Sequence, residues 1–232
     1  MRRALIAAFF LIASCAFGQN RLRDAARQDG SFAWKIRTDG VSICCCEGST
    51  WTERKNYIEY SEIFLVAHVE AGRIERLRMV EPACPITVRI LENVSAEASL
   101  EFLRDHLDDD KHVITAFAMH DHPSVIPDLI TMARRNPSTG IRREAIFWLG
   151  QRAGEKAAGE LRRAVDEDPE DEVRERAVFA IAQLPKERAI PMLTELVKTH
   201  KRPIVRKRAI FWLAQTGDPR ALEVIEEILG VK

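Results

Sequence analysis

The sequence predicts a mainly α-helical protein: an α-solenoid of helical hairpins that follows a small antiparallel β region and a signal peptide. Three observations lead to this prediction. The second half repeats with a period of 32 residues, the first half holds short β-rich runs, and the chain opens on an apolar leader. With 232 residues, the chain is long enough to bury a sizeable core in one or two domains.

The first 18 residues are typical of a secretory signal peptide, which is excluded from the fold. Arg2 and Arg3 precede an apolar run over 4–14 that is too short to cross a bilayer core of about 30 Å as a helix. Ala16 and Gly18 are the small residues that a cleavage site needs. We therefore expect an exported protein, periplasmic or secreted, with no transmembrane span in the mature chain.

A second interpretation of the leader is a lipid anchor. The stretch "IASC" at 12–15 resembles the lipobox of bacterial lipoproteins, in which the cysteine becomes the lipidated N-terminus. The alternative to a soluble exported protein is therefore a lipoprotein anchored through Cys15. A third interpretation, a buried N-terminal helix, also competes.

Residues 19–94 are expected to form a small β-rich domain. The runs "FAWKIR", "SEIFLVAHVE" and "ITVRIL" are rich in β-branched and aromatic residues, and "EAGR" at 70–73 is a turn that predicts a hairpin over 61–80. The sheet should be mostly antiparallel and end near Asn93. A cap helix over 95–108 follows, with Ser95 as its N-cap, and we expect it to cover the first layer of the repeats.

Four cysteines follow the leader: Cys44, Cys45, Cys46 and Cys84. An exported chain meets an oxidising compartment, so we expect one of the first three to form a disulfide with Cys84. Such a bridge closes a loop of about 40 residues, which stabilises by roughly 3–4 kcal/mol in the chain-entropy model. Free or partly paired thiols are one alternative. A metal site is another, although "CCC" lacks the C-x₂₋₄-C spacing of zinc ligands.

The 32-residue unit begins at positions 109, 141, 173 and 205, so the solenoid fills residues 95–232 together with the cap helix. The stretches "AIFWLGQ" (145–151), "AVFAIAQ" (177–183) and "AIFWLAQ" (209–215) align without gaps. Apolar residues recur at helical spacing in two runs per unit, and a turn separates the runs. Each unit is therefore a helical hairpin that buries its apolar face only by stacking on its neighbours. Ala145, Ala177 and Ala209 should let the helices approach closely.

The pattern V-R-x-x-A-[IV]-x-x-[LI]-[GA]-Q, followed by A-[LI]-x-x-[LI], resembles the HEAT repeats of the phycobilisome-lyase-like class. The layout also resembles exported bacterial HEAT-repeat proteins that carry a short cysteine-containing β region before the repeats. The resemblance implies an α-solenoid scaffold and names no activity, because this fold hosts many tasks.

Two columns of repeated residues are candidate functional features. The arginines at 142, 174 and 206 serve either an anionic partner or, as in the family that the repeats resemble, an internal ladder in which each bonds a carboxylate or carbonyl of the preceding link. Phe147, Phe179 and Phe211 lie roughly opposite the face formed by 141, 145 and 149. They either fill gaps between adjacent helices or form an aromatic interface.

The resemblance also implies that the second helices line the concave side of the stack. The residues there that face away from the first helices form the best candidate binding face, and they are Arg188, Met192, Glu195, Arg220, Val224 and Glu227. A solvated surface is the alternative interpretation.

No catalytic motif stands out. His120 and His122 are weak metal candidates, because some HEAT-repeat hydroxylases hold iron with repeated His-Glu pairs, and this chain has no His-Glu dipeptide. Lys+Arg and Asp+Glu both number 35, and this balance gives no electrostatic reason to bind nucleic acid. We expect a non-enzymatic scaffold without a cofactor that binds an unknown protein partner. The alternative is a metal-dependent or redox enzyme related to HEAT-repeat hydroxylases or bilin lyases.

Overall fold

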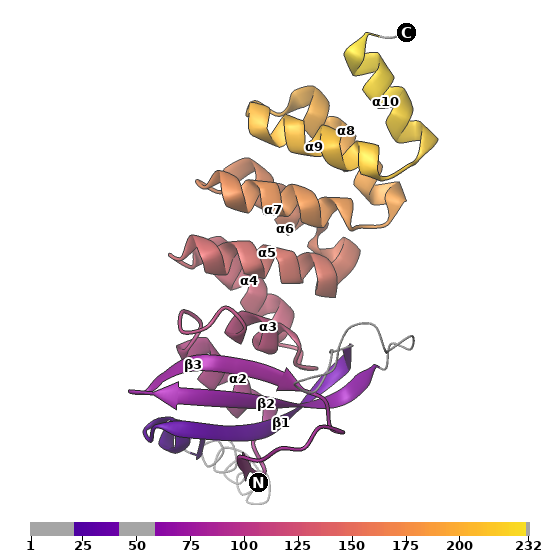
Figure 1. The fold of residues 1–232 in the computed structure, drawn as a ribbon. Helices are drawn as coiled ribbons and strands as arrows, with labels where there is room; N and C mark the ends of the chain where they lie inside the picture. The colour runs from indigo at the N-terminus through magenta and orange to yellow at the C-terminus, as the bar shows by residue number, and fades with distance from the viewer. Residues whose placement is uncertain (1–20, 42–58, 231–232) are drawn as a thin grey trace, which may run out of the picture. The chain divides into compact units, whose positions relative to one another are not determined.

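The computed structural model describes residues 21–41 and 59–230. Contacts between residues divide the chain into two compact units that separate after Val125. We call the first the sheet unit and the second, from Ile126 onward, the repeat unit (Figure 1). Cys15 and Cys44–Cys46, together with the whole leader, lie outside the described residues.

The sheet unit contains four strands in the order β3-β2-β1-β4. Their bounds are Gly30–Val41 (β1), Tyr60–Glu70 (β2), Arg73–Val80 (β3) and Arg89–Leu91 (β4). The predicted hairpin is present, and Ala71 and Gly72 form its two-residue turn. Both have positive φ, 49° and 78°, as the tight turns that match the right-handed twist of antiparallel strands require.

The sheet is mostly antiparallel, as expected, but one strand pair is parallel. β4 runs parallel to β1, with Ala33 opposite Ile90, whereas the other two pairs are antiparallel. The reason is topological. After β3 the chain crosses to the far edge of the sheet, and there it pairs in the same direction as β1.

One face of this sheet is the core of the sheet unit. Phe32, Trp34 and Ile36 alternate along β1 and are buried, opposite Ala67, Leu65 and Ile63 of β2. Helix α2 (Ala96–Asp105) covers them, because the Phe102 ring lies 5.7 Å from that of Trp34 and 6.3 Å from that of Phe32. Ser95 caps the helix as expected, its hydroxyl accepting from the N–H of Ala98 at 3.1 Å. The helix ends earlier than the predicted residue 108, and it packs on the sheet as well as on α3 (Val113–Ala118).

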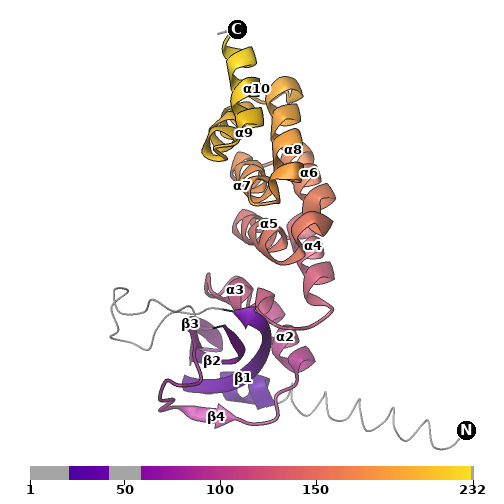
Figure 2. The same cartoon turned by 90° about the vertical axis from the view of Figure 1, so that its right-hand side faces the viewer.

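The repeat unit is built from successive helical hairpins, as the period predicts. Its elements are α4 (Val125–Arg135, whose first residue belongs to the sheet unit), α5 (Thr139–Ala153), η1 (Gly154–Ala157), α6 (Ala158–Glu167), α7 (Asp171–Ala182), α8 (Lys186–Thr199), α9 (Pro203–Gln215) and α10 (Pro219–Leu229). α5, α7 and α9 begin 32 residues apart and form one layer, while α4, α6 and α8 form a second layer (Figure 2). Ala145, Ala177 and Ala209 are fully buried between them.

The links between hairpins also repeat, although their residues differ. Asn136, Asp168 and His200 occupy equivalent positions, and each side chain accepts the backbone N–H two residues further on, at 2.9, 3.0 and 3.2 Å. This local bond closes the turn before the next helix begins. None of the described helices is both long and apolar enough to span a membrane.

Candidate functional site

A chain of aromatic rings runs across the first-helix layer of the repeat unit. The Phe147 ring stacks on that of Phe179, with centroids 6.2 Å apart and planes 12° from parallel. Trp212 lies 4.9 Å from Phe179 and 5.0 Å from Phe211, and Trp148 contacts Phe147 at 5.3 Å. These five rings come from α5, α7 and α9, and we call them the aromatic ridge.

The ridge is neither core nor freely solvated. Phe147, Phe179 and both tryptophans are half-buried, and Phe211 is 46% exposed. The sequence placed the three phenylalanines in one column but left open whether they point inward. A continuous strip of rings at the surface is a typical feature of interfaces, because aromatic side chains offer much apolar area at little cost in side-chain entropy.

Charged residues border the ridge. The Arg176 guanidinium lies 5.2 Å from the Phe147 centroid and 5.9 Å from that of Phe179, and it also forms an ion pair with Glu144 at 3.3 Å. The pair between Arg208 and Glu175 lies one hairpin further on. The ridge therefore combines an apolar centre with a charged border, as protein-binding surfaces do.

The six residues predicted for the second-helix face lie where the repeat places them, on α8 and α10. Their charges are largely engaged. Arg162 reaches Glu195 of the next hairpin at 2.9 Å, and Lys198 reaches Glu227 at 2.8 Å. Arg220 bonds Asp218, while Arg188 is exposed and Met192 and Val224 are half-buried. This face therefore carries exposed ion pairs between adjacent hairpins, and its apolar area is interrupted.

The arginine column is internal, as in the second interpretation of the sequence. Arg142 forms a two-pronged ion pair with Asp168 at 2.9 and 3.2 Å, and both side chains are buried. The hydrogen bond that Arg142 donates to Asp168 raises the pKa of Arg142 above its ordinary value. The next two arginines bond their own links: Arg174 pairs with Asp171 at 3.0 Å, and Arg206 donates to the carbonyls of His200 and Lys201 at 2.7 and 3.0 Å.

The two candidate metal ligands do not face one another. His120 is buried, with Nδ1 2.8 Å from the carbonyl of Ala116 and Nε2 2.8 Å from Oγ of Ser99. His122 instead lies 3.2 Å from Glu97 at the surface. Within 21–41 and 59–230, no group of three or more His, Cys, Asp or Glu side chains is arranged to hold a metal ion. His120 thus bridges α2 and the residues after α3 inside the sheet unit.

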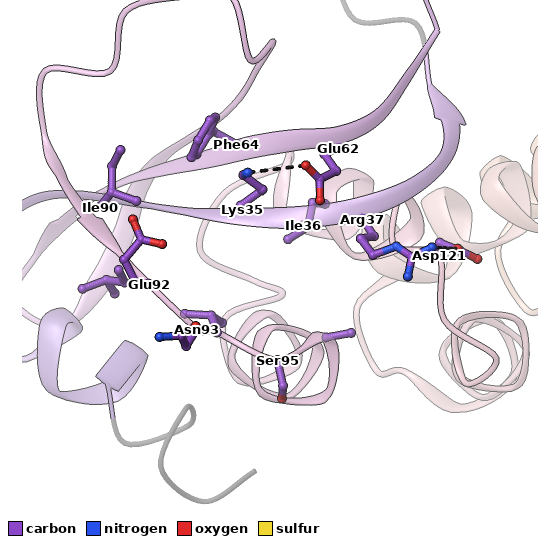
Figure 3. Close-up of a pocket in the computed structure, with 13 residues that line it drawn as sticks. Lys35, Ile36, Arg37, Glu62, Phe64, Ile90, Glu92, Asn93, Ser95 and Asp121 are labelled. Atoms are coloured by element: carbon purple, nitrogen blue, oxygen red, sulfur yellow. Dashed lines mark ion pairs between the residues drawn. The ribbon is translucent and has the colours of Figure 1, made fainter. Parts of the chain in front are cut away.

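Two cavities beside the sheet were not anticipated. The first, about 450 Å³, lies beside β1, β2 and β4, with Phe64 and Ile90 on its apolar wall (Figure 3). Its cations are paired: Lys35 lies 3.4 Å from Glu62, and Arg37 lies 3.8 Å from Asp121. The pairing leaves no local excess of positive charge to attract an anion.

The second cavity, about 520 Å³, lies over β1, β2 and β3. There Ser31 Oγ is 3.0 Å from Nδ1 of His68, and Nε2 of His68 is 3.2 Å from Glu70. The His68 and Glu70 side chains are 45% and 65% exposed, so water competes for these bonds and they are weak. The alternation of polar and apolar residues in "SEIFLVAHVE" places His68 on this face, but only the sheet register brings Ser31 to it.

Cys84 is buried and disulfide-bonded. Its partner is not among the described residues, because Cys84 is the single cysteine within 21–41 and 59–230. The predicted pairing with one of Cys44, Cys45 and Cys46 therefore stays a prediction.

Comparison with known proteins agrees with the hairpin architecture. A sequence model of the family described as HEAT repeats matches residues 110–182 and 161–232, which together span more than half of the chain. No curated protein matches the chain. The matched region begins shortly before α3 and contains every hairpin of the repeat unit.

Proposed function

Because the chain belongs to the HEAT-repeat family, we propose that it is a scaffold that binds another protein through the aromatic ridge of its first-helix layer. The observation that supports this most directly is the unbroken contact of Phe147, Phe179 and Trp212 across three hairpins. HEAT repeats commonly serve as protein-interaction scaffolds, and a rigid stack presents such a strip at little cost in ordering the surface.

The ridge is favoured over the second-helix face on physical grounds. On the second-helix face, charged side chains such as Arg162 and Glu195 interrupt the apolar area. A partner that binds the ridge buries aromatic side chains, and buried aromatic side chains dominate the energetics of most interfaces. Arg176 lies over two of these rings and, paired with Glu144, forms part of the charged border of the ridge.

Photo-crosslinking with a matched control tests the proposal. Two otherwise wild-type chains are made, one with a photoreactive residue at Lys207 and one with a photoreactive residue at Glu223. Each chain is crosslinked in extract from its source cells. The substitutions Phe211→Ser and Val224→Ser are then introduced separately. We expect a protein that crosslinks to wild type and to the Val224 variant but is lost from the Phe211 variant.

The side chain at 211 is already half exposed, so its replacement leaves the fold in place, and circular dichroism verifies this. Loss of the crosslinked protein from the Val224 variant alone would assign binding to the second-helix face. Recovery of no specific protein from any extract would contradict the scaffold proposal.

The proposal also places the scaffold outside the reducing cytoplasm, either soluble or anchored through Cys15. The leader composition and the disulfide at Cys84 support an oxidising compartment. Mass spectrometry of the mature N-terminus tests this placement. Cleavage after Gly18 is expected for the soluble form. A diacylated Cys15, lost in Cys15→Ala, identifies the lipoprotein, and an intact leader contradicts export.

A further inference from the structure

The links between the hairpins are closed by side chains of different chemistry. At the first two links the acceptor is an oxygen: the amide oxygen of Asn136, and the carboxylate of Asp168, which is paired with Arg142. At the link between α8 and α9, residues 200–202, the acceptor is Nδ1 of His200, 3.2 Å from the backbone nitrogen of Arg202. A ring nitrogen accepts a hydrogen bond only while it carries no proton. This link therefore depends on the protonation state of one imidazole.

The contacts of His200 select one neutral form of its ring. Because Nδ1 accepts from the N–H of Arg202, the proton of the neutral ring lies on Nε2, which is 3.6 Å from Oδ1 of Asp166 in α6. The side chain is only 9% exposed, so water has little access to it. A second proton has to go to Nδ1, where two N–H groups would then face each other. Protonation thus replaces the hydrogen bond that closes the link by a contact between two donors.

The charges that α6 and α8 contribute give a protonated ring little support. Within the described parts of the chain, Asp166 is the one carboxylate at ion-pair distance from the ring. Arg162 already holds this carboxylate at 2.8 Å and also pairs with Glu195 of α8 at 2.9 Å. The Asp166 side chain is 40% exposed, so solvent screens its attraction for a further cation.

The link itself and α9 contribute mainly cations. Arg206 of α9 donates to the carbonyls of His200 and Lys201 at 2.7 and 3.0 Å. The Arg202 guanidinium is engaged by Asp171 of α7 at 3.2 Å. A positive charge on the ring would lie among these cations, and like charges disfavour it. The link is therefore built around the neutral ring.

The position of α9 depends on this link. The helix begins at Pro203, and its N-cap residue, Arg202, forms no capping bond through its own side chain. The imidazole of His200 instead holds the N–H of that residue. Further along, α9 supplies Phe211 and Trp212 to the aromatic ridge, where Trp212 contacts a ring of α7. A loosened link thus alters the contact of two ridge residues with the rest of the ridge.

We propose that the α8–α9 link is a pH-sensitive device: a proton taken up by His200 opens the link and loosens α9, while the links at Asn136 and Asp168 stay closed. The neutral ring closes the link, so its stabilising contribution is complete above the range in which histidine takes up a proton. The contribution is lost as the pH falls through that range, between about pH 8 and 5. One consequence rests on the proposed function of the aromatic ridge: acid weakens partner binding, because Phe211 and Trp212 move with α9.

Hydrogen exchange of the full chain, followed by mass spectrometry, tests the link directly. His200→Asn is the matched variant, because asparagine closes the equivalent link at 136 and does not titrate. Both chains are compared at the same pH, so the pH dependence of chemical exchange cancels. At about pH 7.5, peptides over 200–210 should exchange alike in both chains, and at about pH 5.5 they should exchange about fivefold faster in wild type. This factor corresponds to about 1 kcal/mol, the net value of one hydrogen bond.

Two controls belong to this experiment. Peptides over 136–142 and 168–174 cover the links without an imidazole and should show no difference between the chains at either pH. Asp166→Asn removes the carboxylate that faces Nε2 and should leave the response to acid in place, because the closing bond is made by Nδ1. Circular dichroism verifies that each variant is folded. Should His200→Asn not fold, His200→Asp, with the residue of the link at 168, takes its place.

Nuclear magnetic resonance of the ¹⁵N-labelled imidazole gives a second readout, and the neutral ring should carry its proton on Nε2. Three results overturn the proposal. The first is equal exchange of wild type and His200→Asn in acid. The second is a link that acid protects, or a response that disappears in Asp166→Asn, since either would mean that the ion pair with Asp166 dominates. The third is a neutral ring with its proton on Nδ1.

Photo-crosslinking from Lys207 at the two pH values extends the test to the partner. The captured protein should decrease about fivefold in acid for wild type and stay constant for His200→Asn, since the opening of the link sets both numbers. A partner that acid leaves bound to wild type, although the link has opened, overturns the regulatory consequence. Capture of no protein at either pH contradicts the proposed function of the ridge, and the exchange data then decide on the link alone.

Discussion

The sheet unit and the repeat unit satisfy their buried polar groups in different ways. In the sheet unit one shared hydroxyl serves two buried ring nitrogens. Trp34 Nε1 donates to Ser99 Oγ at 2.7 Å, and the same oxygen lies 2.8 Å from Nε2 of His120. In the repeat unit an arginine recurs in each first helix. Each bonds groups of the link before its own helix, and Arg142 also bonds Asp168 in the following link.

This difference predicts different responses to damage. The cluster in the sheet unit joins β1, α2 and the residues after α3, so losing one member affects three elements together. Each hairpin of the repeat unit contacts mainly its neighbours, so damage there should stay local and broaden the unfolding transition. Hydrogen exchange followed by mass spectrometry measures both units in one sample.

The largest effect is expected from Arg142→Ala. It leaves the carboxylate of Asp168 buried without its cation, and breaking a buried pair in this way costs about 3–5 kcal/mol. Hydrogen exchange should increase in α5, α6 and α7 and stay unchanged in the strands. The matched control is Arg206→Ala, whose partners are carbonyls of its own link, and it should lose only about 1–2 kcal/mol. Equal losses from both variants would contradict a special role for the buried ion pair.

Ser99→Ala should destabilise the sheet unit by about 2–3 kcal/mol, since it removes the hydrogen-bond partner of both a buried donor and a buried acceptor. Hydrogen exchange of β1 and α2 at increasing urea concentrations reports the loss. Ser31→Ala removes an exposed hydroxyl from β1 and should change stability by less than about 0.5 kcal/mol. A Ser99 variant as stable as wild type would show that the buried cluster contributes little.

Gly150→Ala tests the close packing of the repeat unit. A Cβ at this position would lie 2.9 Å from Cβ of Ala180, so α5 and α7 have to separate slightly, at a cost of about 1–2 kcal/mol. Gly159 in α6 has open space around it, with nothing within 4 Å of an added Cβ. Gly159→Ala should therefore stabilise by up to about 1 kcal/mol through helix propensity. Thermal melts that move in the same direction for both variants would contradict this packing argument.

The sequence was sufficient to predict the hairpins, because period, turns and buried alanines all repeat. It was not sufficient to predict features in which different residue types play the same structural role at equivalent positions. Asn136, Asp168 and His200 close equivalent links, but no identity connects them in an alignment of the repeats. The exposure of Phe147, Phe179 and Phe211 likewise depends on their neighbours. Trp148 and Trp212 occupy equivalent positions of the repeat, and the middle hairpin has Ala180 there. At Ala180, α5 approaches α7 closely.

In the sheet unit the sequence was less informative, since its signals are not repeated. "HDH" suggested two equivalent ligands, but His120 is buried because Ser99, 21 residues earlier, offers it a partner. β4 has only three residues and no local pattern that distinguishes parallel from antiparallel pairing. Such features depend on contacts between distant residues, whereas the hairpin pattern depends on near neighbours.

The smallest expected effect is on the pH dependence of the stability of α10. Asp218 caps α10 by accepting from the N–H of Arg220 at 3.0 Å, and its carboxylate pairs with the Arg220 guanidinium at 2.9 Å. The hydrogen bond from that guanidinium lowers the pKa of Asp218 from 3.8 to about 2. Because the pKa is lower in the folded state, the carboxylate stabilises α10 fully above pH 3.8, and this contribution is lost as the pH falls through about 2.

Asp218→Asn keeps a capping oxygen but removes the charge, so the variant should lack this part of the acid dependence. The difference in hydrogen exchange of α10 between wild type and variant, followed from neutral pH downward, isolates the effect from the other carboxylates. Wild type should protect α10 better than the variant above pH 3.8, and the two should converge as the pH approaches 2. The strands should not respond, because the sheet unit has no share in this cap. A difference that persists unchanged at the lowest pH would show that Asp218 acts through its capping geometry and not through its charge.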